Sequence, residues 1–109
     1  MNLQGKKTVV TGGSRGIGFE ICKIFLENGA DVVAVSQNSE NLRIAAELLP
    51  SLMTFQANVA LPADNERLAD WILNLWGSLD ILVNNAGISP NGGTELTTQP
   101  DTIFDEILQ

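Results

Sequence analysis

Short β-branched runs alternate along the chain with longer segments in which apolar residues recur at helical spacing. The strand-like runs are Lys7 to Thr11, Asp31 to Ser36, Leu52 to Ala57 and Asp80 to Asn84. This alternation is typical of an α/β domain in which helices connect the strands of a parallel sheet. We therefore predict a doubly wound parallel sheet that stops after its fourth strand.

Three helices are predicted between these strands, each from apolar residues about one helical turn apart. The apolar stripes are Ile17, Ile21, Ile24 and Phe25; Leu42, Ala45, Ala46 and Leu49; and Leu68, Ile72, Leu75 and Trp76. Glycine permits the left-handed cap that ends many helices, and Asn28-Gly29 and Gly77 follow the first and third stripes. Pro50 ends the second, and the third begins after Pro62.

The last part of the sequence predicts a loop followed by one more helix. Residues 87–97 are rich in Gly, Ser, Asn, Thr and Pro, which favours a loop. Thr98-Gln99-Pro100-Asp101 resembles a capping signal, and the helix that it opens carries apolar residues up to Leu108. Together these segments predict one incomplete domain over residues 1–109.

Composition narrows the classes of function. The 109 residues hold 44% apolar residues, enough for a core, but no run approaches the ~20 residues that cross a bilayer. No signal-peptide pattern opens the chain, so the cytosol is the expected compartment and no membrane association is expected. A net charge of −7 with six scattered Lys and Arg argues against a nucleic-acid partner.

Metal and thiol chemistry are also disfavoured. The chain has no histidine, and its one cysteine, Cys22, lies in a helix-like apolar pattern away from any metal-ligand spacing. We expect Cys22 to be a buried or half-buried structural thiol, and we expect no metal site.

A glycine-rich segment, Thr11 to Gly18, connects the first strand to the first helix, where a doubly wound sheet binds pyrophosphate. Its spacing is Gly-x-x-x-Gly-x-Gly, and no Gly-Lys-Ser/Thr follows, which excludes a P-loop. A tight turn without a ligand is the alternative interpretation of this segment taken alone.

Two motifs together carry a family resemblance. Gly12, Gly16 and Gly18 in a Thr-Gly-x-x-x-Gly-x-Gly context resemble the cofactor motif of short-chain dehydrogenases/reductases. Asn84-Asn85-Ala86-Gly87 after the fourth strand resembles the second signature of the same family. The resemblance implies a Rossmann-like fold with strand order 3-2-1-4, hydride transfer in carbonyl reduction or alcohol oxidation, and a dinucleotide as partner.

The resemblance and the position of the strand ends together define a set of candidate cofactor-binding residues. These are Gly12, Ser14, Arg15, Gly16, Ile17, Gly18, Ser36, Gln37, Asn58, Val59, Asn85, Ala86 and Gly87. In the family, the place of Asn58-Val59 usually holds Asp-Val, which contacts the adenine.

The end of the second strand bears on the choice of cofactor. An acid there would bind the ribose 2′-hydroxyl of NAD, but the chain has Ser36 and Gln37. Arg15 is placed to pair with a 2′-phosphate, although Gln37 replaces an arginine of many NADP-binding relatives. We expect NADP(H) rather than NAD(H), with dual use and a merely solvated Arg15 as alternatives.

The resemblance also implies catalytic residues that this sequence lacks. The family uses a serine, a tyrosine and a lysine four residues after that tyrosine, and these 109 residues contain no tyrosine. We expect no catalytic residue in the chain and no activity from the chain alone. The alternative is a non-catalytic module that binds a dinucleotide or a partner. Either way, the open edge of the fourth strand and the final helix predict self-association or pairing.

Overall fold

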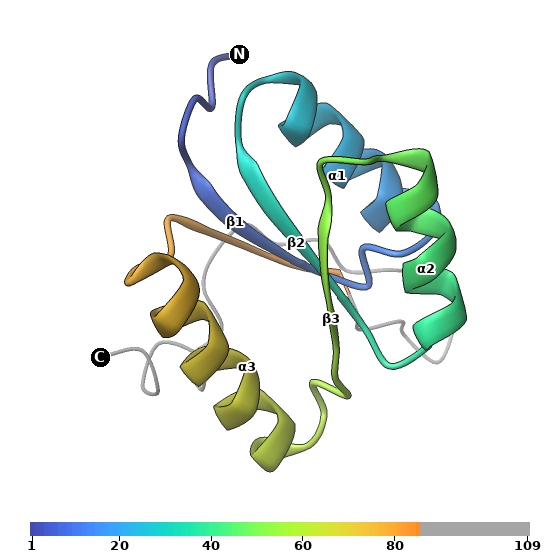
Figure 1. Cartoon of the computed structure of the whole chain (residues 1–109), viewed down its shortest axis with the longest axis vertical. Coiled ribbons are helices and arrows are strands. Elements are labelled where there is room, and N and C mark those ends of the chain that lie inside the picture. The colour runs from blue at the N-terminus through green and yellow to red at the C-terminus, as the bar shows by residue number, and fades with distance from the viewer. Residues whose placement is uncertain (86–109) are drawn as a thin grey trace.

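The computed structural model describes residues 1–85, which form one four-stranded parallel sheet with helices on both faces (Figure 1). In chain order, the elements are β1 (Lys7–Thr11), α1 (Gly16–Glu27), β2 (Asp31–Ser36), α2 (Ser39–Leu48), β3 (Met53–Gln56), α3 (Pro62–Trp76) and β4 (Ile81–Asn84). The strand order β3-β2-β1-β4 confirms the predicted doubly wound arrangement. The predicted loop at 87–97 and the final helix lie outside the described residues.

Alternate residues of the central strands fill two separate cores, because successive side chains of a strand point to opposite faces of the sheet. Val9 and Val33 pack with Leu68 and Ile72 on the α3 side. Val10 and its neighbours pack with α1 and α2 on the other side. Successive residues are therefore buried along residues 8–11 of β1 and 32–35 of β2, as expected for a parallel sheet with helices on each side.

The predicted apolar stripe of α1 is only partly right. Ile21 and Phe25 pack against the core, but Ile17 and Ile24 are 56% and 45% exposed. The buried face of the helix is centred instead on Gly18 and Cys22, small residues that let α1 lie close to the sheet. Helical spacing alone did not distinguish this face from the neighbouring one, because large apolar residues occur on both.

The stripes of the other two helices are closer to prediction. Leu42 and Ala45 of α2 are buried, as are Leu68 and Ile72 of α3. Leu75 was wrongly included, since it is 41% exposed, whereas Trp71 packs against the core. The predicted helix ends are confirmed: Gly77 takes a left-handed conformation directly after α3.

Within residues 1–85, β4 pairs only with β1 and β3 only with β2, so each forms an edge of the described sheet. Self-association through the β4 edge stays a prediction, and the final helix invoked with it is not among the described residues. No helix in this part of the chain is long and apolar enough to cross a membrane.

Candidate functional site

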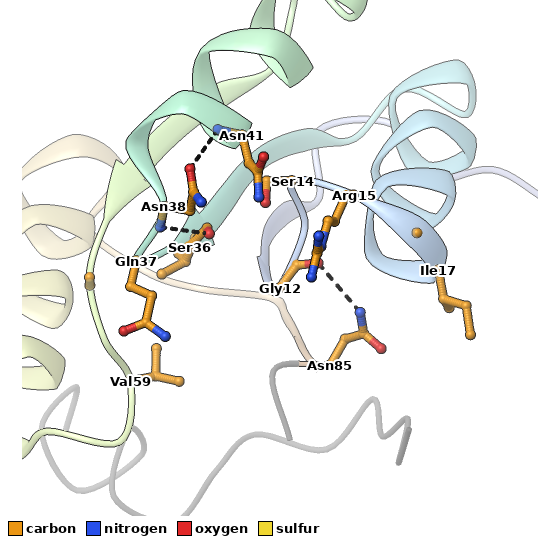
Figure 2. Close-up of a pocket in the computed structure, with 13 residues that line it drawn as sticks. Gly12, Ser14, Arg15, Ile17, Ser36, Gln37, Asn38, Asn41, Val59 and Asn85 are labelled. Atoms are coloured by element: carbon orange, nitrogen blue, oxygen red, sulfur yellow. Dashed lines mark hydrogen bonds between the residues drawn. The ribbon is translucent and has the colours of Figure 1, made fainter. Parts of the chain in front are cut away.

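A cavity of about 730 Å³ opens where the carboxyl ends of the strands meet the first turns of α1 and α2 (Figure 2). Because β4 lies beside β1 rather than beside β3, the order of the strands reverses at β1. Ligands of open α/β sheets bind at such reversals. The cavity is lined by Gly12, Ser14, Arg15, Gly16, Ile17, Val35, Ser36, Gln37, Asn38, Asn41, Ala57, Val59 and Asn85.

The glycine loop is held tightly against the start of α1. A Cβ atom at Gly18 would lie 2.0 Å from the carbonyl oxygen of Gly12 and 2.7 Å from the side-chain nitrogen of Asn85. Any side chain at position 18 would therefore push the loop away from the helix. Gly18 does not line the cavity itself, but it allows the loop to form the cavity floor.

The start of α1 is free of side-chain caps. Arg15 is the N-cap residue with an extended backbone, and its side chain makes no capping hydrogen bond. By contrast, Asn38 caps α2 by accepting a hydrogen bond from the N–H of Asn41 at 2.9 Å. The first N–H groups of a helix need partners and carry partial positive charge, so the uncapped α1 presents donors suited to an anion.

Asn85 connects the end of β4 to this loop. Its backbone N–H donates to the hydroxyl of Thr11 at 2.9 Å, and its side-chain NH2 donates to the carbonyl of Gly12 at 3.4 Å. The side-chain oxygen of Asn85 is buried and has no hydrogen-bond partner among residues 1–85. A buried acceptor of this kind is costly unless a donor reaches it.

Cys22 of α1 and Gly13 of the glycine loop pack against each other. The Cys22 thiol is fully buried, as predicted, and contacts the carbonyl oxygen of Gly13 at 3.7 Å. Burial raises the pKa of Cys22 to about 12, so the thiol stays protonated and unreactive at neutral pH. A Cβ atom at Gly13 would lie 3.0 Å from the Cys22 sulfur and from Ala34. The sequence motif gave no sign of this packing role for Gly13.

The charges around the cavity are few. Arg15 is the only charged residue among those that line it, and no carboxylate within residues 1–85 forms an ion pair with Arg15. Glu40, the acidic residue in the first turn of α2, forms an ion pair with Arg43 at 2.5 Å. Hydrogen bonding and attraction to the Arg43 guanidinium lower the pKa of Glu40. The local field at the cavity is therefore set by one positive side chain and neutral amides.

Most candidate residues from the sequence meet in this one cavity. Those that line it are Gly12, Ser14, Arg15, Gly16, Ile17, Ser36, Gln37, Val59 and Asn85. Ala86 and Gly87 lie outside the described residues. Asn58 does not line this cavity: it lies in an adjoining one of about 310 Å³ that shares Gln37 and Ala57 with it. The Asn58 N–H donates to Asp64 at 2.7 Å, and its side-chain oxygen accepts from the N–H of Ala60.

Sequence reasoning missed two polar lining residues, Asn38 and Asn41, on the first turn of α2. Asn38 had a recognisable signal, since asparagine before a helical stripe is a favoured N-cap. Asn41 carried none, because an asparagine within a polar helix start is indistinguishable from a solvent-exposed residue until the helix is placed beside the glycine loop.

Comparisons with known proteins agree on one family. The sequence model of the short chain dehydrogenase family matches residues 6–109. The chain is 43% identical over 93 residues to the 3-oxoacyl-[acyl-carrier-protein] reductase FabG of Chlamydia pneumoniae, covering 82% of this chain and 38% of that protein. It is 39% identical over 88 residues to the uncharacterized oxidoreductase DltE of Bacillus subtilis, covering 81% of this chain and 35% of that protein.

A solved structure has a similar fold. The Pseudomonas aeruginosa RhlG/NADP active-site complex superposes with a TM-score of 0.75 and 40% sequence identity, covering 82% of this chain and 37% of that one. The chain thus spans well under half the length of these relatives. From the family match over residues 6–109 and the shared sheet, the chain belongs to the short-chain dehydrogenase/reductase family of oxidoreductases.

Proposed function

We propose that this chain is an NADP(H)-binding portion of an oxidoreductase that reduces a carbonyl or oxidises an alcohol. The observation that carries the choice of NADP(H) is the charge of the cavity lining: among residues 1–85, Arg15 lines the cavity and no carboxylate does. A carboxylate at the end of β2 would bind a ribose 2′-hydroxyl and repel a 2′-phosphate. Ser36 and Gln37 at that place are neutral.

The size of the cavity also supports the binding of a dinucleotide. Its volume of about 730 Å³ lies in the usual range for cofactor sites. The close approach of Gly12 and Gly18 leaves room for phosphate against the uncapped start of α1. Gly12, Gly16, Ile17 and Asn85 would hold the pyrophosphate and the neighbouring riboses.

The adenosine end would lie toward β2 and β3. Ser36, Gln37 and Val59 line that side of the cavity. Asn58 would reach the adenine only from the adjoining cavity, with its side-chain oxygen already bonded to the Ala60 N–H. Ala86 and Gly87 remain proposed contacts on the β4 side.

The bound dinucleotide would supply the hydride, but proton transfer needs a separate group with a suitable pKa. These 109 residues contain neither tyrosine nor histidine. We therefore expect the chain by itself to bind cofactor without catalysing the reaction.

A titration of the full chain with NADPH and with NADH, followed by calorimetry, tests the proposal. We expect NADPH to bind at least about tenfold more tightly, because charge-assisted hydrogen bonds to the extra phosphate contribute about 1.5–3 kcal/mol. Arg15→Gln should remove most of this preference. Lys23→Gln is the control, because Lys23 is also exposed on α1 but does not line the cavity. Equal binding of the two dinucleotides would contradict the NADP(H) preference.

A further inference from the structure

The side-chain amide of Asn41, on the first turn of α2, lines the cavity. Its backbone N–H is occupied by the Asn38 side chain, but its own side chain forms no hydrogen bond with any residue in the described part of the chain. The neighbouring polar groups are engaged: the Asn38 oxygen accepts from Asn41, and the Ser36 hydroxyl accepts from the Asn38 N–H at 3.1 Å. Among Ser36, Asn38 and Asn41, only the Asn41 side chain forms no hydrogen bond within residues 1–85, and the Gln37 side chain at the end of β2 is unbonded there as well.

Ser14 supplies a second free group from the glycine loop. The residue is only 8% exposed, lines the same cavity, and has no side-chain hydrogen bond within residues 1–85. Because its hydroxyl oxygen keeps some access to the open cavity, Ser14 can donate a hydrogen bond to a ligand there. In Figure 2, the Asn41 side chain points from the first turn of α2 toward the loop that carries Ser14.

The carboxylate of Glu40, next to Asn41 in the chain, does not reach the cavity. Glu40 precedes Asn41 in the chain, but Arg43 holds its carboxylate on the exposed surface of α2, with a second bond from Arg43 to Glu47. Glu40 does not line the cavity. In the part of the chain that the structure describes, the place between Ser14 and Asn41 is therefore bordered by hydrogen-bond donors and by Arg15, and by no acid.

We propose that Asn41, together with Ser14, binds the phosphate on the adenosine ribose of NADP(H) and so adds to the preference for this cofactor that Arg15 provides; this inference rests on the proposed function. A phosphate is an acceptor of several hydrogen bonds. The Asn41 amide and the Ser14 hydroxyl each donate one, while Arg15 contributes the charge. Two neutral donors from α2 and the glycine loop thus take the place of an arginine at position 37.

The test measures the dissociation constants of NADPH and NADH for Asn41→Asp and Ser14→Ala in the full chain. A carboxylate at position 41 turns a donor into a like charge, so we expect NADPH to bind at least about tenfold more weakly. NADH, which lacks the phosphate, should bind within about twofold of the parent protein. Ser14→Ala should weaken NADPH by roughly three- to tenfold.

Asn74→Asp is the matched control. It makes the same change of charge on α3, where Asn74 is exposed and bonds only to the Asp70 carbonyl. Asn41 lies in the first turn of α2, where an acidic side chain favours the helix, so Asn41→Asp should remain folded. Circular dichroism of each variant checks this point.

The outcomes separate this inference from the proposed function. A parent chain that prefers NADPH, with Asn41→Asp weakening both dinucleotides equally or neither, would overturn the role of Asn41 and leave the proposed function standing. A parent chain that binds neither dinucleotide would overturn both. Selective loss of NADPH in Asn41→Asp, with Asn74→Asp unchanged, supports both.

Discussion

The hydroxyl of Thr11 accepts a hydrogen bond of 2.9 Å from the backbone N–H of Asn85, a residue 74 positions later in the chain. The same hydroxyl lies 3.1 Å from the side-chain oxygen of Asn84 and 3.3 Å from the carbonyl of Val83. Thr11 ends β1 and Asn85 follows β4, so this contact joins the two strands at the edge of the cavity. The glycine loop that starts at Gly12 is thereby positioned from the β4 side as well as from β1.

Thr11→Val tests this junction. Valine keeps the shape and the β-branched side chain but removes the acceptor, which leaves the buried Asn85 N–H without its partner. We expect the free energy of unfolding to fall by about 1–3 kcal/mol in urea denaturation. Thr54→Val on the edge strand β3 is the control, because no side-chain hydrogen bond is found for Thr54 within residues 1–85. Equal stability of the two variants would contradict a role for the Thr11 hydroxyl.

Gly18→Ala should disturb the loop by steric overlap. The added methyl group would lie 2.0 Å from the Gly12 carbonyl oxygen, so the loop has to move. We expect a loss of about 1–3 kcal/mol of stability, as for other overpacked sites. Gly16→Ala offers a comparison, because nothing lies within 4 Å of its added methyl group and only the left-handed backbone is strained. That strain costs about 1–2 kcal/mol.

The two glycine variants should differ in structure as well as in stability. The amide resonances of Asn85 and Gly12 should shift on nuclear magnetic resonance in Gly18→Ala, because the displaced carbonyl is the acceptor for Asn85. Unchanged resonances in Gly18→Ala would show that the loop is not held as tightly as the geometry indicates.

Cys22 should make the protein less stable at alkaline pH. Its pKa is raised from 9.0 to about 12 by burial, so the unfolded chain loses the thiol proton first as the pH rises. The folded state then holds more protons, and stability falls from about pH 9 upward by about 1.4 kcal/mol per pH unit. Urea denaturation at pH 8 to 10.5 should show a steeper fall than for Cys22→Ala, in which this titration is absent. Parallel curves for the two proteins would contradict a buried thiol at position 22.

Gln37→Arg should strengthen the binding of NADPH. Position 37 lines the cavity at the end of β2, and it also lines the adjoining cavity, to which Asp64 and Arg67 belong. A guanidinium there adds a charge-assisted bond to the ribose phosphate, and we expect about tenfold tighter binding of NADPH with NADH unchanged. The control is Gln4→Arg, which adds the same charge before β1, where Gln4 lies beside Gly29. An equal gain for NADH would show a general attraction to the two dinucleotides instead of recognition of the extra phosphate.

The positions of the strands were predictable from the sequence because the local chemistry is unambiguous. The apolar, β-branched centres of β1 and β2 mark these strands, and both begin and end at the predicted residues. Helix ends at Gly29 and Gly77 followed from the left-handed conformation that only glycine adopts easily. The glycine loop and Asn85 were identified as site residues because two separate motifs flank neighbouring strands.

The order and type of the elements followed from the sequence, since these depend on local preferences and on the period of apolar residues. The buried face of α1, the close approach of Gly18 to Gly12 and the shared cavity of Asn41 and Ser14 became known from the folded structure. These relationships depend on the close packing of segments distant in the chain. A single sequence does not show such distances, because local patterns of residues do not indicate which distant segments come into contact in the folded sheet.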